Sequence, residues 1–183
     1  MKVYKIFVVF LFISSFFLSV HSSQKILLDK LFNELIETDD LNNAKQLEKK
    51  IWSVWSEHPD DNELTEKMQF GIELMEYGDY NYALKIFNNI IITDPKWSEA
   101  WNKRATVYFL MNKFKNSLDD IDKVLSIEPR HFGALSGQAR IFIKLREYEK
   151  AIESIERALK FHPSLSNREL IPEIERLIKE QSI

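Results

Sequence analysis

Few side chains in this sequence have a type and spacing that could perform chemistry. Asp119, Asp120 and Asp122 lie close together in the segment DDIDK and raise the possibility of a metal site. On a helix these carboxylates would fan around the axis, so we interpret them as a solvated helix face. The sequence contains no G-x-S-x-G, phosphate-binding loop or H-E-x-x-H motif, and no cysteine. We therefore expect no enzyme activity, no metal and no cofactor.

Histidine and arginine side chains give no catalytic pattern either. His58, His131 and His162 each lie within two residues of a proline, and none has an acidic residue at the spacing of a metal site or proton relay. They are predicted to cap helices or form turns. Arg104, beside the small residue Ala105, is predicted to form a buried structural ion pair in preference to a substrate contact.

A pair of glycines in the segment HFGALSGQARIF suggests binding instead. Gly133 and Gly137 are four residues apart where the pattern predicts a helix, and each glycine costs a helix about 1 kcal/mol relative to alanine. One hypothesis is that a partner segment lies close against this small-residue patch. The other is that Gly133 lies near the helix start, where it costs little, and that Gly137 eases contact between neighbouring helices.

The composition indicates a helical protein with a substantial core. Apolar residues make up 45% of the 183 residues, and only four glycines and five prolines interrupt the chain. We predict an all-α fold. The formal net charge is -3, and without the two lysines of residues 1–22 it becomes -5. This mild acidity offers no basic stripe, so no nucleic-acid partner is expected.

Residues 1–22 are predicted to be a signal peptide that exports the protein. Lys2 and Lys5 precede an apolar run over residues 6–20, and small residues follow around Ser22. The alternative is an inner-membrane anchor formed by residues 6–20, although a spanning helix needs about 20 residues. A membrane contact is expected only if this segment stays uncleaved. Because there is no cysteine, the exported chain must be stabilised by packing alone.

A period of 34 residues organises the rest of the chain. It relates three prolines, two rows of small residues, and the large apolar residues that accompany them. These residues are Pro95, Pro129 and Pro163; Gly71, Ala105 and Ala139; Ala83, Ser117 and Ala151; Leu74, Tyr108 and Phe142; Tyr80, Phe114 and Tyr148; and Phe87, Ile121 and Ile155. The pattern predicts antiparallel helix pairs in which a small residue receives a large one, and in which proline ends each pair.

These residues resemble the tetratricopeptide repeat family, with Trp101 at the family's first aromatic anchor. The resemblance covers residues 62–166 as three repeats, at about 64–97, 98–131 and 132–165. It implies a right-handed α-solenoid of antiparallel helix pairs. The sequence is also similar to short exported members of the family in Gram-negative bacteria, which implies a periplasmic location.

Two further segments flank the repeats. Residues 23–61 are predicted to form a degenerate helical pair, out of strict phase, that caps the N-terminal end of the stack. Residues 167–183 are predicted to form a capping helix that shields the last apolar face. Its start is placed between Asn167 and Pro172, and the spacing of Ser166 and Glu169 suggests a capping box.

The resemblance implies that the first helix of each repeat lines a concave groove. The groove residues carried over by position are Met68, Ile72, Met75, Asn102, Lys103, Thr106, Phe109, Gly133, Ser136, Gly137, Arg140 and Lys144. We expect Arg140 and Lys103 to pair with carboxylates of a partner segment, and Phe109 and Met75 to contact its apolar side chains. Both glycines then point into the groove.

We predict a non-catalytic interaction module that binds a peptide or protein segment in this groove as an exported scaffold or adaptor. The alternative is a self-associating structural subunit of a cell-envelope assembly, which would use the convex face or one end of the stack. Light scattering separates the two. The sequence alone names neither the partner nor the oligomeric state.

Overall fold

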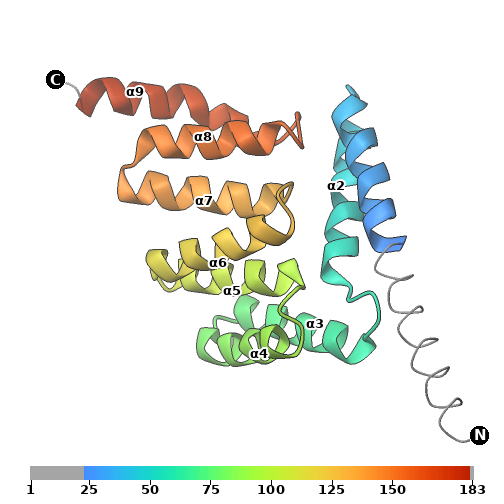
Figure 1. Cartoon of the computed structure of the whole chain (residues 1–183). Coiled ribbons are helices and arrows are strands. Elements are labelled where there is room, and N and C mark those ends of the chain that lie inside the picture. Colours follow the sequence, from blue (N-terminus) through green and yellow to red (C-terminus); the bar gives the residue numbers. More distant parts are fainter. Residues whose placement is uncertain (1–22, 182–183) are drawn as a thin grey trace, which may run out of the picture.

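The computed structural model describes residues 23–181, which form helices and connecting turns and contain no strand. A first helix covers residues 23–37. It is followed by α2 (Leu41–Ser56), α3 (Asn62–Glu76), α4 (Tyr80–Thr93), α5 (Ser98–Leu110), α6 (Phe114–Ile127), α7 (Phe132–Leu145), α8 (Tyr148–Leu159), the 3-10 helix η1 (Ser166–Leu170) and α9 (Ile171–Gln181). The predicted all-α solenoid is confirmed (Figure 1). None of the described helices has both the length and the apolar character needed to span a membrane. The predicted signal peptide lies outside the described residues.

Helices α3 to α8 form three antiparallel pairs that stack on one another (Figure 1). Within each pair the small residues allow close packing, as the period of 34 predicts. A Cβ on Gly71 would lie 2.7 Å from Phe87 Cε1, so only glycine fits there. Ala105 and Ala139 are both buried, and Ser117 Oγ donates a hydrogen bond of 2.7 Å to the Ala105 carbonyl.

The turn inside each pair repeats in the same conformation. Gly78, Asn112 and Arg146 all adopt positive φ, at 82°, 58° and 61°. The amide after each of them donates 2.8 Å to a carbonyl five residues back, which ends the first helix in the same way three times. Glycine and asparagine suit this left-handed conformation, whereas Arg146 adopts it at some cost because the repeat geometry requires it.

The C-terminal end of the stack is covered by α9, which packs Ile174, Leu177 and Ile178 against α8. The helix begins at Ile171, inside the predicted range of starts. The predicted capping box does not form, because Ser166 lies within η1 and the cap position falls on Leu165, which makes no side-chain cap bond.

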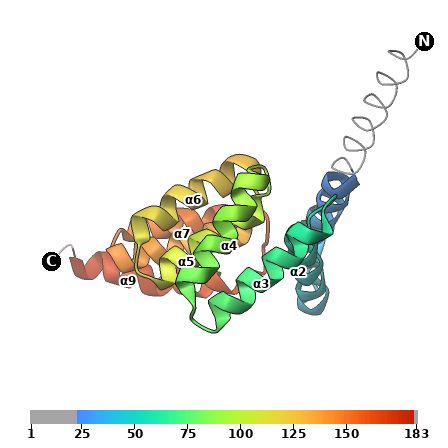
Figure 2. The same cartoon turned by 90° about the horizontal axis from the view of Figure 1, so that it is seen from below.

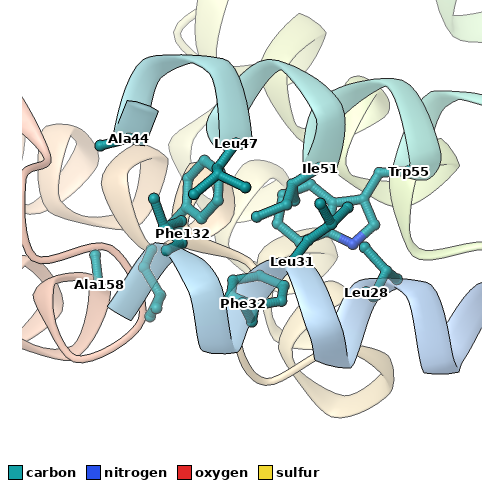
Figure 3. Close-up of a cluster of buried hydrophobic side chains, with 11 residues drawn as sticks. Leu28, Leu31, Phe32, Ala44, Leu47, Ile51, Trp55, Phe132 and Ala158 are labelled. Carbon is teal, nitrogen blue, oxygen red and sulfur yellow. The ribbon is translucent and has the colours of Figure 1, made fainter. Parts of the chain in front are cut away.

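The N-terminal pair, residues 23–56, is called the hairpin below, and its position differs from the prediction. Instead of capping the stack beside α3, it runs across the turns that join successive repeats (Figures 1 and 2). Figure 3 shows its apolar side chains meeting Phe132 of α7 and Ala158 of α8. The buried cluster consists of Leu28, Leu31, Phe32, Leu35, Ala44, Leu47, Ile51, Trp55, Phe132, Leu135 and Ala158.

The free end of the stack explains this position. Ala100 and Val107 of α5 are buried, but the residues one period earlier are Glu66 and Glu73 of α3, and both are exposed. A preceding helix pair would have to bury these two carboxylates, which is costly without partners. The apolar face of the hairpin therefore packs against the later repeats.

Polar contacts fix the hairpin to both turns between repeats and to the turn that follows the third repeat. Trp97 Nε1 donates 2.8 Å to the Trp55 carbonyl. The Arg130 guanidinium lies 2.7 Å from Asp29, and His162 Nε2 lies 3.2 Å from a Glu48 carboxylate oxygen. The hairpin thus bridges turns that are otherwise linked only through the stacked repeats.

Candidate functional site: a cavity on the concave face

A cavity of about 330 Å³ lies where the hairpin meets the first helices of the second and third repeats. Glu48 and Trp52 of the hairpin form one side, and residues 165–167, between α8 and α9, form another. Eight of the predicted groove residues line it: Asn102, Lys103, Thr106, Phe109, Gly133, Ser136, Gly137 and Arg140. Ala105, Ser117, Ile121, Phe132 and Ala134 complete the lining.

Four predicted groove residues lie elsewhere. Met68 is fully buried in the core of the first repeat, and Ile72 and Met75 pack against the same cluster. Asn102 and Ser136, one and two periods after Met68, line the cavity, whereas the apolar Met68 side chain packs into the core instead. Lys144 is exposed but does not line the cavity.

The two glycines of α7 have different roles. A Cβ on Gly133 would lie 2.3 Å from Trp52 Cη2, so this glycine makes room for a side chain of the hairpin. A Cβ on Gly137 would meet only Ile121 Cδ1, at 3.7 Å, which is an ordinary contact distance. Thus Gly133 accommodates part of the same chain, and Gly137 alone leaves open space at the cavity.

Lys103 is not free to pair with a ligand carboxylate, contrary to the prediction from the sequence. Its Nζ lies 3.0 Å from Oε1 of Glu99, a carboxylate with no exposed surface. Burial raises the pKa of Glu99, but the charge of Lys103 and the hydrogen bonds from His131 and Lys103 outweigh it and hold the pKa below its ordinary value. Glu99 therefore stays ionised, and the Lys103 ammonium is committed to it.

His131 joins this ion pair to the start of α7. Its Nδ1 accepts a hydrogen bond of 3.1 Å from the Ala134 amide, so Nε2 carries the proton and donates to Glu99 Oε2 at 3.0 Å. The ring stacks on Trp55 of the hairpin, with centroids 3.9 Å apart. The predicted capping role is confirmed for this residue.

Each of the three histidines also pairs with an acidic residue that lies far from it in the sequence. His58 lies 3.0 Å from Asp94, and His162 pairs with Glu48, whose pKa is lowered chiefly by that hydrogen bond. The acids of the three pairs are 36, 32 and 114 residues from their histidines. No short sequence motif could have revealed pairs at such separations.

The prediction for Arg104 is confirmed, whereas that for the aspartates needs correction. Arg104 forms two hydrogen bonds with Asp120, of 2.6 and 2.7 Å, so Asp120 is buried instead of solvated. Asp119 and Asp122 are exposed as predicted. Across residues 23–181 no group of three His, Cys, Asp or Glu side chains could hold a metal ion.

Arg140 is the cation at the cavity that is left available. Its side chain is exposed, and it makes no hydrogen bond or ion pair with the part of the chain that the structure describes. It lies where the cavity meets a smaller one of about 240 Å³, lined also by Ser136, Asn167 and Glu169. A ligand with a carboxylate would find its partner here.

Comparison with known families agrees with the repeat register. The tetratricopeptide repeat model matches residues 98–131 and 133–164, which are the second and third predicted repeats almost to the residue. The chain contains tetratricopeptide repeats. A TPR repeat-containing protein of Rhizobium etli is 34% identical over 107 residues, covering 58% of this chain and 52% of the relative. Tetratricopeptide repeat protein 36 of Caenorhabditis elegans is 30% identical over 106 residues, covering 58% of each. The chain thus spans little more than half the length of these curated relatives.

Solved tetratricopeptide repeat structures have the same fold. The first TPR of Spaghetti (RPAP3), bound to the HSP90 peptide SRMEEVD, superposes with a TM-score of 0.62 at 20% identity, covering 66% of this chain and 96% of that one. The TPR2B domain of yeast Sti1, in a pHsp70 complex, gives 0.55 at 22% identity, covering 67% and 98%. MamA gives 0.54 at 16% identity, covering 86% and 90%.

The two glycines of the third tetratricopeptide repeat allow a matched test of this geometry. Gly133→Ala should destabilise the protein by about 1–3 kcal/mol, because the new Cβ overlaps the Trp52 ring. Gly137→Ala should instead stabilise it by up to about 1 kcal/mol, because alanine favours the helix and meets no close atom. Urea unfolding measures both changes, and shifts of the same sign would contradict the placement of Trp52.

Proposed function

We propose that this protein is a non-catalytic interaction module, exported from the cytoplasm, that binds an extended protein segment in the concave cavity as a scaffold or adaptor. The observation that carries the proposal is a cavity beside small residues and one uncommitted cation, Arg140. Its volume lies within the usual range of ligand sites. Two structures of the same fold are complexes, with an HSP90 peptide for Spaghetti and with pHsp70 for yeast Sti1, which supports peptide binding.

The surface around Arg140 favours a close-lying main chain. Ser136 and Gly137 project little or no side chain into the cavity, and the Ser136 hydroxyl already donates to the Phe132 carbonyl. A segment that crosses this patch approaches the helix closely and places an acidic group at Arg140. The ion pair of Lys103 with Glu99 contributes no net charge to this recognition.

Peptide binding is tested by immobilising residues 23–183 and selecting from a phage-displayed library of heptapeptides. Calorimetry on synthetic copies of the enriched peptides then gives their affinities. Gly137→Leu should fold, fill the cavity and weaken binding at least tenfold. Asn116→Leu adds the same side chain at an exposed position of α6 outside the cavity and should leave the affinity unchanged. Failure to enrich any peptide, or equal affinities for both variants, would refute the proposed site.

The export part of the proposal has a separate test. Cell fractionation with N-terminal sequencing should find a mature chain that starts near Ser23 outside the cytoplasm. Full-length protein in the inner membrane would establish the anchor alternative, and full-length protein in the cytoplasm would refute export.

Self-association remains the competing function, because one end of the array exposes aromatic surface. Phe70, Tyr77 and Tyr82 of the first repeat are 52%, 88% and 57% exposed. Light scattering of the mature chain distinguishes the two functions: a monomer supports the binding module, and a concentration-dependent oligomer supports the structural subunit.

A further inference from the structure

The hairpin and the segment after α8, which lie outside the repeats proper, supply part of the cavity wall. We propose that they determine its specificity, selecting an extended segment that carries a large apolar side chain and, about 10 Å away, a carboxylate. This proposal rests on the peptide-binding function proposed above. It assigns the apolar subsite to Trp52, the carboxylate subsite to Arg140, and a main-chain contact to Asn167.

Trp52 is held rigidly at the hairpin end of the cavity. Its ring meets Trp55 and Phe132 edge to face, with centroids 5.4 and 5.5 Å away, and it lies over Gly133. The side chain is only partly buried and lines the cavity. A fixed aromatic wall of this kind binds an apolar side chain with little loss of its own conformational freedom.

The charges at the cavity differ from one end to the other. Glu48 lies at the hairpin end, where its bond to His162 keeps it ionised, and an anionic ligand group is disfavoured there. Arg140 lies seven residues after Gly133, so about 10 Å separates them along the helix. A peptide in the extended polyproline II conformation advances about 3.1 Å per residue and returns to the same face every third residue, so two side chains three residues apart span this distance and both face the cavity. The carboxylate of the ligand therefore belongs at Arg140, and its apolar side chain at Trp52.

Asn167 provides an acceptor between the two cavities. Its Nδ2 donates 3.1 Å to Ser136 Oγ, whereas its buried Oδ1 receives no hydrogen bond from the residues that the structure describes. Because a buried acceptor without a donor is unfavourable, turning this side chain so that Oδ1 meets a ligand N–H gains more than the same contact at an exposed carbonyl. A main-chain amide of an extended segment matches this need.

The experiment uses fluorescein-labelled peptides in which phenylalanine and glutamate are separated by zero to five serines, with a blocked C-terminus. Fluorescence anisotropy with residues 23–183 should give the tightest binding at a spacing of two serines, falling at least fivefold at zero and five. Replacing glutamate by glutamine should also weaken binding at least fivefold. A second series ends in a free C-terminal carboxylate in place of glutamate. Equal binding there means that any carboxylate suffices, and weaker binding assigns the site to an acidic side chain.

Variants separate the subsites. Arg140→Gln should abolish the preference for glutamate over glutamine, whereas Lys144→Gln, an exposed cation one turn further along α7, should keep it. Trp52→Leu should reduce the preference for phenylalanine over alanine and retain that for glutamate. Asn167→Ala should weaken all peptides about equally, by roughly threefold to tenfold.

The outcomes distinguish this inference from the function on which it rests. If library-selected peptides bind and are sensitive to Gly137→Leu, but the designed series shows no dependence on spacing or on Arg140, the inference is overturned and the function stands. If no peptide of either origin binds at the cavity, both are overturned.

Discussion

Phe132→Ala should lower the free energy of unfolding by about 3–5 kcal/mol and release the hairpin from the repeats. Phe132 is 1% exposed, and its ring lies 5.0 to 6.2 Å, between centroids, from the rings of Phe32, Trp52, Trp55 and His162. Truncation leaves a cavity at the point where α7 meets the hairpin (Figure 3). The variant therefore weakens the contact between α7 and the hairpin more than it weakens the stack of repeats.

Denaturant unfolding measures the total change, and native-state hydrogen exchange locates it. In Phe132→Ala the amides of residues 24–56 should lose protection before those of α5 and α6. Phe87→Ala is the matched control, because Phe87 is equally buried in a cluster that contains no hairpin residue. Loss of protection in the hairpin with both variants, or with neither, would contradict the docking of the hairpin on α7.

Lys103→Ala is expected to destabilise the protein by about 3–5 kcal/mol, because it removes the cation beside the fully buried Glu99. From the sequence alone this position belongs to an open groove, where the same change would cost about 0.5 kcal/mol or less. Lys144→Ala, at an exposed position, is the control and should show the smaller loss of stability. Thermal unfolding of the two variants at pH 7 distinguishes a buried ion pair from an open groove position. Equal decreases in melting temperature would mean that buried Glu99 is not stabilised by Lys103.

The effect of Lys103→Ala should also depend on pH. In the wild-type protein the pKa of Glu99 lies below its unfolded value, so its ionisation contributes stability above that value and this contribution is lost as the pH falls through the folded pKa. Without Lys103, the burial of Glu99 is less well compensated and the folded pKa rises. The stability difference between wild type and variant should therefore be largest near neutral pH and shrink in acid.

The repeated helix pairs could be predicted because the residues that form them lie close together in the sequence. Gly71, Ala105 and Ala139 each meet a partner within the same repeat, so residue size and a fixed period suffice to identify the contact. The same reasoning placed eight of the groove residues around one cavity. It failed for Met68, because position in the repeat does not show whether an apolar side chain turns into the core.

The hairpin could not be placed from the same signals. Its partners Phe132 and Ala158 lie about a hundred residues away, and it does not follow the period. One signal was present in the sequence: Glu66 and Glu73 stand where the next repeat has Ala100 and Val107, so the first repeat offers no apolar surface to a preceding pair. That pattern excludes the predicted cap, although it does not say where the hairpin goes instead.

The position of the hairpin also determines when its apolar side chains can be buried during synthesis. Its contact between Glu48 and His162 joins residues 114 positions apart. A ribosome adds about 5–20 residues per second, so the hairpin emerges some 5–20 seconds before the turn that it must meet. During this interval Leu31, Phe32 and Ile51 lack the third repeat that helps to bury them. The hairpin, which is synthesised before all the repeats, is thus among the last parts to be buried, and a holding chaperone would have its most exposed target there.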